Sequence, residues 1–439
     1  MVHWRLVVYK IFFVLLVMLS GMGGHGREVE PEAVEKFKLL GFPADYAVKL
    51  AFLHKKHPNW QFRALYISRL NPLYTWQYVL YMESDKAPSR SLVSGNRIFE
   101  DYFHKSDLTI YDANCRRAST AAVAYFLDPR NFLNERDIFQ FVDLSFNKDI
   151  PLEAVQSALK GTFMARGKLE DGRSYAQWLY ELGSKFNVDP LFLASRVRQE
   201  QGAKGTPLIS GKCGDVLADL YFSSGGSRVF KGGIFELKLY NGLYNFFNID
   251  ASGNGRFTIY LNGMREAQKG NPEMSKVWGS PAWNCKWKAL YGGSEKIASR
   301  YIYNYQNTLY LQKWNVDFRS RSGKGNSRNF WGQYMQNIGG AFSESRTTYN
   351  SLAKNGLLEE KFLFLIPVYS SMPEKVSPDP GNGKCKYYRS FDYNENIVIR
   401  KKSPEKTKKQ TDPWLRLLEN LQQKSFWQDI YWNLYLKLY

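Results

Sequence analysis

Glu200 is the side chain in this sequence whose local context best suits proton donation. Residues 189–202 predict a short helix, because Asp189 can cap its start, Pro190 suits the first helical position and Gly202 suits the turn after its end. Glu200 would lie in the last turn, where exposed carbonyl oxygens favour the protonated carboxyl, although two arginines of the same helix favour the ionised form. A general acid near neutral pH needs a retained proton of this kind.

The distribution of histidine excludes several classes of hydrolase. All five histidines lie at or before position 104, so residues 174–373 contain no imidazole. A histidine-ligated zinc amidase, a Cys-His endopeptidase or a Ser-His-Asp esterase cannot be built within that region. Carboxyls, hydroxyls, amides and backbone groups remain, which is the inventory of a glycosidase. We therefore expect no metal and no organic cofactor.

Four strings in this order carry a family resemblance. They are residues 195–202 (SRVRQEQG), 242–249 (GLYNFFNI), 306–316 (QNTLYLQKWNV) and 331–338 (WGQYMQNI). From about residue 174 to 373, the chain resembles the endo-β-N-acetylglucosaminidase domain of bacterial cell-wall hydrolases, glycoside hydrolase family 73. Two strings before this region, 57–60 (HPNW) and 125–135 (YFLDPRNFLNE), are similar to the segment that precedes the domain in clostridial-type wall glucosaminidases.

The resemblance implies a fold, an activity and two catalytic residues. The fold would be α+β, a lysozyme-like and mainly helical catalytic domain with a small β-hairpin lobe, preceded by a mixed α/β N-terminal region. The activity would be cleavage of the β-1,4 bond between N-acetylglucosamine and N-acetylmuramic acid of peptidoglycan. Glu200 matches the family's catalytic acid, and Tyr244 matches a tyrosine thought to orient the N-acetyl group.

The second catalytic group is left open. Many glycosidases use a paired carboxylate, and Asp219 is the assigned candidate, with Asp215 and Glu236 as neighbouring alternatives. Each of the three is also explained as a solvated loop residue. Enzymes that act on N-acetylated sugars can instead use the acetamide oxygen of the substrate, which would require no second carboxylate.

Five further residues are candidates for binding the sugar. Three side-chain amides could form hydrogen bonds with hydroxyl and acetamide groups of the sugar, those of Gln199, Asn245 and Asn248. Phe247 could stack on a pyranose face. Tyr301 is a candidate for the cleft wall. A buried turn with one aromatic side chain in the core would explain part of this set without any substrate.

Apolar spacing predicts the elements that must position these residues. Helices are expected around residues 46–53, 118–127, 175–186 and 333–337, and a short strand begins near residue 60. The Gly- and Ser-rich interval between Glu200 and Tyr244 predicts loops and a hairpin. Residues 128–131 predict a turn and a helix cap.

Composition shifts divide the chain into four parts. We expect a signal peptide or N-terminal anchor (1–26), an accessory region (27–168), the glucosaminidase domain (169–375) and a basic tail with an amphipathic helix (376–439). A Pro- and Gly-rich linker is expected from Pro373 to Asn382. The four cysteines leave two alternatives open, disulfides or free thiols.

Charge and the first segment indicate the partners. The net charge of +19 on an exported chain favours anionic wall polymers alongside the peptidoglycan strands, rather than nucleic acid. The protein would be secreted or envelope-associated, and an uncleaved N-terminal segment would associate with the membrane. The alternatives left open are a lytic transglycosylase or muramidase on the same polymer, and a non-catalytic wall-binding protein.

Overall fold

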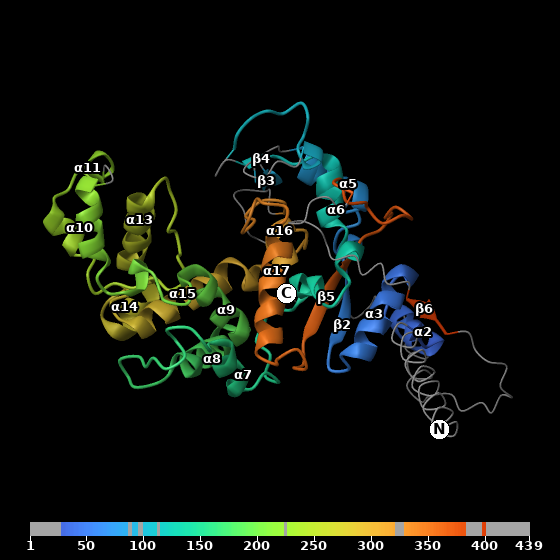
Figure 1. Cartoon of the computed structure of the whole chain (residues 1–439), viewed down its shortest axis with the longest axis horizontal. Coiled ribbons are helices and arrows are strands. Elements are labelled where there is room, and N and C mark those ends of the chain that lie inside the picture. The colour runs from blue at the N-terminus through green and yellow to red at the C-terminus, as the bar shows by residue number, and fades with distance from the viewer. Residues whose placement is uncertain are drawn as a thin grey trace, which may run out of the picture.

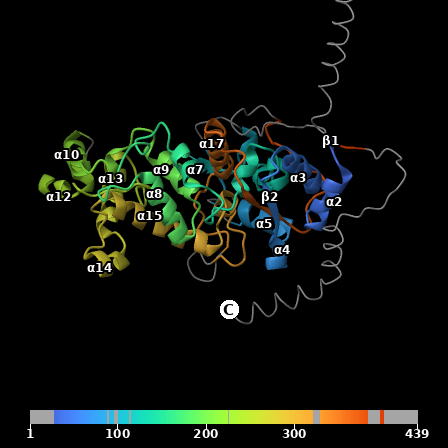
Figure 2. The same ribbon diagram turned by 90° about the horizontal axis from the view of Figure 1, so that it is seen from below.

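The structure is a computed structural model that describes residues 28–86, 90–94, 100–111, 115–223, 226–320, 329–382 and 397–400. The expected signal segment, the C-terminal amphipathic helix and most of the basic tail lie outside these residues. In two perpendicular views, α10 lies at one end of the molecule, α2 and α3 lie at the other, and α9 and α17 lie between them (Figures 1 and 2). Among the described residues, no helix has both the length and the hydropathy that crossing a bilayer requires.

Helices make up most of the regular structure. The first part of the chain forms α2 (Pro31–Leu39), α3 (Ala44–Lys56), α4 (Ile67–Leu70), α5 (Trp76–Ser84), α6 (Thr120–Leu127) and α7 (Leu152–Ala158), with short 3-10 helices η3 (Glu100–Tyr102), η5 (Pro129–Phe132) and η6 (Asp137–Phe141). The second part forms α8 (Tyr175–Phe186), α9 (Pro190–Gln201), η7 (Pro207–Ile209), α10 (Cys213–Ser223), α11 (Gly226–Val229), α12 (Ile234–Lys238), α13 (Arg256–Lys269), α14 (Pro272–Trp278), α15 (Lys286–Arg300), η8 (Ile302–Asn304), α16 (Leu309–Trp314) and α17 (Gly340–Lys354).

Three two-stranded sheets complete the described structure. The strands are β1 (Glu28–Val29), β2 (Gln61–Tyr66), β3 (Leu92–Ser94), β4 (Cys115–Arg117), β5 (Leu363–Val368) and β6 (Val398–Ile399). The parallel pair β2 and β5 joins the predicted accessory region to the predicted catalytic region, with Gln61 opposite Leu363 and Tyr66 opposite Val368. The pair β1 and β6 is also parallel, whereas β3 and β4 are antiparallel. The prediction of a mainly helical α+β fold is confirmed.

Local sequence signals account for several elements. The expected helices near residues 46, 118 and 175 are α3, α6 and α8, and the expected strand is β2. Ser174 caps α8 by accepting a hydrogen bond from the amide of Gln177, whose side chain in turn accepts from the amide of Ser174. Trp60, Phe139 and Phe364 form an aromatic core beside β2 and β5, with ring centroids 5.1 to 5.5 Å apart.

The predicted β-hairpin lobe is wrong. The interval from Glu200 to Tyr244 folds into α10, α11 and α12, and the residues described there contain no strand. Cys213 and Leu217, at helical spacing, are fully buried on one face of α10, which packs against α13. Burial of this face stabilises helix over the extended backbone that the Gly and Ser content suggested.

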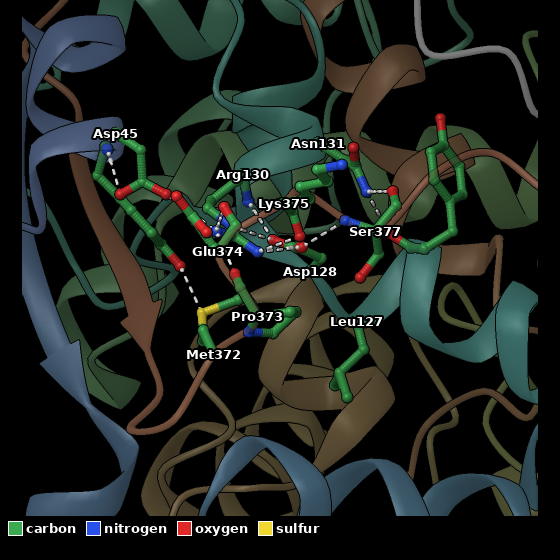
Figure 3. Close-up of polar contacts among 12 residues, drawn as sticks. Asp45, Leu127, Asp128, Arg130, Asn131, Met372, Pro373, Glu374, Lys375 and Ser377 are labelled. Atoms are coloured by element: carbon green, nitrogen blue, oxygen red, sulfur yellow. Dashed lines mark hydrogen bonds and ion pairs between the residues drawn. The ribbon is translucent and has the colours of Figure 1, made fainter.

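Residues 373–382 are held against the first part of the chain and do not form a free linker. The buried guanidinium of Arg130 forms an ion pair with Asp128 at 2.9 Å and donates to the carbonyl of Pro373 at 3.0 Å (Figure 3). The amide of Ser377 donates to the same carboxylate oxygen, Asp128 Oδ2, at 3.0 Å. Asp128 also caps η5, so the predicted turn and cap are confirmed.

Candidate active site

Helix α9 presents Glu200 in its last turn. The side chain of Asp189 accepts a hydrogen bond from the amide of Phe192 at 2.9 Å, and Pro190 is the first helical residue. The helix ends before Gly202, whose φ of 68° favours glycine. The start and end signals predicted from the sequence are therefore confirmed, and they fix the position of Glu200.

Both carboxyl oxygens of Glu200 accept a hydrogen bond. The Nδ2 atom of Asn248 donates to Oε2 at 3.0 Å and to the main-chain oxygen of Glu200 at 3.0 Å. The hydroxyl of Tyr334 donates to Oε1 at 3.4 Å. Asn248 is itself fixed, because the buried side chain of Gln201 donates to its Oδ1 at 2.7 Å. The half-buried carboxyl is thus held in one orientation from two sides.

Burial raises the pKa of Glu200 above the ordinary value of a glutamate. The charge of Arg196 and the hydrogen bond from Asn248 oppose this rise in pKa, the charge of Glu344 adds to it, and the hydrogen bond from Tyr334 opposes it. Glu200 therefore keeps its proton to a higher pH than a solvated glutamate does. The sequence left the direction of this pKa shift open between the helix end and the two arginines, and the largest cause in the structure is burial.

A buried ion pair limits the influence of Arg196 on Glu200. The guanidinium of Arg196 contacts the carboxylate of Glu344, on α17, through Nη2 at 3.0 Å and Nη1 at 3.3 Å. The same Nη1 donates to the hydroxyl of Tyr334 at 3.0 Å, and Gln199 donates to Glu344 Oε1 at 3.3 Å. Because Glu344 partly neutralises Arg196, burial determines the direction of the shift in the pKa of Glu200.

A small pocket borders this ion pair. It has a volume of about 40 Å³ and is lined mostly by apolar side chains, with Arg196, Gln199 and Glu344 among its polar residues. A space of this size holds water molecules rather than a sugar ring. Glu200 is not among the residues that line this pocket.

The turn at residues 244–249 contributes one side chain to Glu200 and uses others to stabilise itself. Asn245 is fully buried, and its Nδ2 donates to two main-chain carbonyls at 2.9 and 3.0 Å while its Oδ1 accepts from a backbone amide at 3.0 Å. Phe247 is 4% exposed and belongs to the hydrophobic core. Neither Asn245 nor Phe247 faces solvent, so their burial does not support the predicted contacts with substrate.

Two predicted tyrosines lie in different surroundings. Tyr244 stacks on Phe246 with ring centroids 6.5 Å apart, and no hydrogen bond joins it to Glu200 in the described structure. Tyr301 packs its half-buried ring edge-on against Tyr334, with centroids 5.4 Å apart. The structure therefore brings Tyr301 into the neighbourhood of Glu200 and gives Tyr244 other neighbours.

Asp219, Asp215 and Glu236 are exposed residues of the lobe formed by α10, α11 and α12. Asp215 accepts from the side chain of Asn241 at 3.0 Å, and Glu236 accepts from an amide at the start of its own helix at 3.2 Å. Helix α10, which carries Asp219, lies at the end of the molecule in both views (Figures 1 and 2). The geometry does not place these carboxylates among the hydrogen-bonding partners of Glu200.

Two residues of the site were not predicted from the sequence. Tyr334 lies in one of the strings that carry the resemblance, but residues 333–337 are irregular and the helix predicted there is wrong. The amide of Tyr334 donates to the carbonyl of Gln312 at 2.9 Å, so a long-range contact replaces the helical hydrogen bond. Glu344 had no sequence signal beyond its place on a helical face.

The described part of the chain contains no group of three or more His, Cys, Asp or Glu side chains arranged to hold a metal ion. Cys213 and Cys285 are free thiols, one of the alternatives left open, and burial raises the pKa of the Cys213 thiol to about 12. Cys385 lies outside the described residues. The polar groups around Glu200 are amides, hydroxyls, a guanidinium and a second carboxylate, which suit an organic substrate rich in hydroxyl and amide groups.

Comparisons with known proteins agree with the resemblance found in the motifs. No family model matches the sequence. The bifunctional autolysin of Staphylococcus epidermidis is 24% identical over 200 residues, which cover 45% of this chain and 12% of that protein. The chain therefore matches only a small part of its curated relative's length.

Solved structures similar to this chain include staphylococcal glucosaminidases. S. aureus glucosaminidase B is 19% identical, with a TM-score of 0.43, over 73% of this chain and 97% of that chain. A catalytic mutant of S. aureus Autolysin E in complex with the disaccharide NAG-NAM is 17% identical, with a TM-score of 0.38, over 67% of this chain and 97% of that chain. Together with the sequence match to the bifunctional autolysin, these structures are what the chain is similar to.

Proposed function

We propose that this protein is a peptidoglycan hydrolase that cleaves the β-1,4 bond between N-acetylglucosamine and N-acetylmuramic acid, with Glu200 as the general acid. The observation that carries the proposal is the half-buried carboxyl of Glu200, whose pKa is raised by burial. A protonated carboxyl of this kind can donate its proton to the leaving glycosidic oxygen as the bond breaks.

The contacts around Glu200 favour participation of the substrate over a second protein carboxylate. The charge of Glu344 contributes to the raised pKa of Glu200. The carboxylate of Glu344, however, already accepts hydrogen bonds from Arg196 and Gln199. The acetamide oxygen of the sugar would then attack the anomeric carbon while Glu200 protonates the leaving oxygen. Asn248 holds the carboxyl during this step.

The choice of bond is supported by the names of the similar proteins. Glucosaminidase B of S. aureus carries this activity in its name, and the complex of S. aureus Autolysin E holds a NAG-NAM disaccharide. The relatives are bacterial autolysins, which supports a location outside the cytoplasmic membrane, either secreted or attached to the envelope. Anionic wall polymers and the membrane stay predicted partners, on the net charge and the first segment.

Analysis of the products tests the assignment of the bond. Digestion of purified peptidoglycan should release fragments with N-acetylglucosamine at the reducing end, which reduction with borohydride and mass spectrometry identify. Anhydro-muramic ends would instead show a lytic transglycosylase, and muramic acid at the reducing end would show a muramidase. A commercial muramidase digest of the same wall preparation provides the reference for the last outcome.

Tyr334→Phe tests whether the tyrosine hydroxyl tunes Glu200. The hydroxyl donates to the carboxyl and so stabilises its charged form, which means that its removal raises the pKa of Glu200 further. Activity that needs the proton is lost as pH rises through this pKa, so the alkaline limb of the kcat/KM profile should move to higher pH. The exposed Tyr303 provides a matched control, and Tyr303→Phe should leave the limb in place.

A further inference from the structure

The segment that carries Tyr334 has no regular structure to hold it. Residues 329–338, here called the Tyr334 segment, form turns and irregular backbone before helix α17. Nevertheless, the hydroxyl of Tyr334 lies within hydrogen-bonding distance of both Glu200 and Arg196. Something outside the segment must therefore fix its position.

A buried polar cluster holds the residue next to Tyr334. Gln333 donates through Nε2 to Glu83 Oε1 at 2.7 Å and accepts at Oε1 from Lys313 Nζ at 3.2 Å. Glu83, on α5, and Lys313, on α16, are both fully buried, and Lys313 Nζ lies 3.7 Å from Glu83 Oε2. Ser91 donates to the same Oε2 at 3.0 Å. Both ends of the Gln333 amide are thus held by opposite charges.

Further contacts to the segment come from the first part of the chain. Leu92 donates its amide to the carbonyl of Gln336 at 2.9 Å and accepts from the amide of Ile338 at 3.0 Å. The hydroxyl of Tyr74 donates to Asn329 at 2.9 Å. The predicted accessory region therefore supplies both backbone and side-chain contacts to a segment that contacts the proposed acid.

The buried charges are poorly explained by stability alone. Burial lowers the pKa of Lys313 to about 8 and raises the pKa of Glu83, so desolvation of each group outweighs its attraction to the other. Two apolar side chains at such positions are often as stable as a buried ion pair, or more stable. An amide held between two opposite charges, however, has one preferred position, which apolar packing does not provide.

We propose that Glu83 and Lys313 are positioning residues, which hold Gln333 and thereby place the hydroxyl of Tyr334 against Glu200. The proposal rests on the proposed function of Glu200 as the acid. It makes residues 28–167 a part of the active-site assembly rather than a separate accessory module. No role in binding the sugar is assigned to either charged residue.

The double variant Glu83→Leu/Lys313→Met tests this proposal in the full chain. Both charges of the pair are removed together, so neither Glu83 nor Lys313 leaves its partner buried alone, and the thermal transition shows whether the fold is retained. We expect kcat/KM on a soluble glycan to fall by about tenfold, because the hydroxyl of Tyr334 is no longer held in place. The alkaline limb of the pH profile should move to higher pH, in the direction expected for Tyr334→Phe.

A double-mutant cycle separates positioning from a purely structural role. In a Tyr334→Phe background, Glu83→Leu/Lys313→Met should produce no further movement of the alkaline limb, because its effect acts through the missing hydroxyl. The matched control is Asp128→Leu/Arg130→Met, which removes another buried pair, far from the Tyr334 segment in sequence (Figure 3). The control should change thermal stability without moving the limb. A limb that stays at the wild-type position in Glu83→Leu/Lys313→Met would overturn the proposal.

Hydrogen exchange provides a measurement that does not depend on catalysis. Amides of residues 329–338 should exchange about tenfold faster in Glu83→Leu/Lys313→Met than in wild type, and the control pair should leave them unchanged. If wild type cleaves no glycan, the proposed function fails, and the exchange rates still decide whether Glu83 and Lys313 hold the segment. If wild type is active and the exchange rates in Glu83→Leu/Lys313→Met are unchanged, the positioning role is rejected and the proposed function still stands.

Discussion

Glu200→Gln should abolish glycan cleavage while leaving the protein folded. The amide has nearly the shape of the carboxyl but carries no proton that it can donate to a leaving oxygen. Loss of a general acid typically lowers a rate by about 10²- to 10⁴-fold, so clearing in a zymogram of wall polymer should disappear. A reducing-end assay gives the residual rate, and the thermal transition shows that the fold is retained.

Two controls make this result specific to Glu200. Asp219→Asn changes an exposed carboxylate of the α10 lobe and should retain near wild-type clearing, whereas a loss equal to that of Glu200→Gln would restore Asp219 as the second catalytic group. Glu200→Gln should still bind wall polymer, since attraction between a chain of net charge +19 and an anionic polymer does not need this proton. Equal clearing by Glu200→Gln and wild type, or clearing by neither, would favour the wall-binding alternative.

Local signals were sufficient to place the acid. Asp189, Pro190 and Gly202 act within one or two turns of the backbone, and each does in the structure what its residue type predicts. The pattern of apolar residues in α8 likewise predicts its buried face, because helical periodicity needs no knowledge of the partner. An element whose ends are set by residues adjacent to it in the sequence can therefore be predicted from the sequence alone.

Burial separates two asparagines that look alike in the sequence. Asn245 and Asn248 lie in one turn and have the same side chain, but Asn245 is fully buried with its amide bonded to the backbone, whereas Asn248 reaches Glu200. An amide that stabilises a turn and an amide that forms hydrogen bonds with a sugar have the same donors and acceptor. The contact with the carbonyl of Gly263 on α13, which Asn245 makes, belongs to the folded chain and has no local sequence signal.

Long-range contacts explain the remaining differences. Tyr334 contacts Glu200 across 134 positions of the sequence, and Arg196 pairs with Glu344 across 148. The helix predicted at residues 333–337 does not form, because contacts to Gln312 and Leu92 bind the backbone in another conformation. No local pattern records such partners, so the residues that tune the acid could not be assigned before the fold.

The cluster around Arg130 is a second place where long-range contacts decide stability. The guanidinium is 3% exposed, its partner Asp128 is fully buried, and it also contacts Asp45 at 3.0 Å (Figure 3). Its Nη1 donates to the carbonyl of Pro373 and so joins η5 to the end of the predicted catalytic region. None of these residues contacts Glu200, so the cluster should affect stability rather than the pH profile.

Arg130→Met should lower the free energy of unfolding by about 3 to 5 kcal/mol, because it leaves the carboxylate of Asp128 buried without its cation. Asp128→Asn/Arg130→Met removes both charges and should recover part of that loss, which urea denaturation of the three proteins measures. The recovery would be incomplete, since the carbonyl of Pro373 still lacks its donor. A single variant that is no less stable than the double variant would show that Asp128 is neutralised by another route, and the ion pair would then not be what ties residues 373–377 to the core.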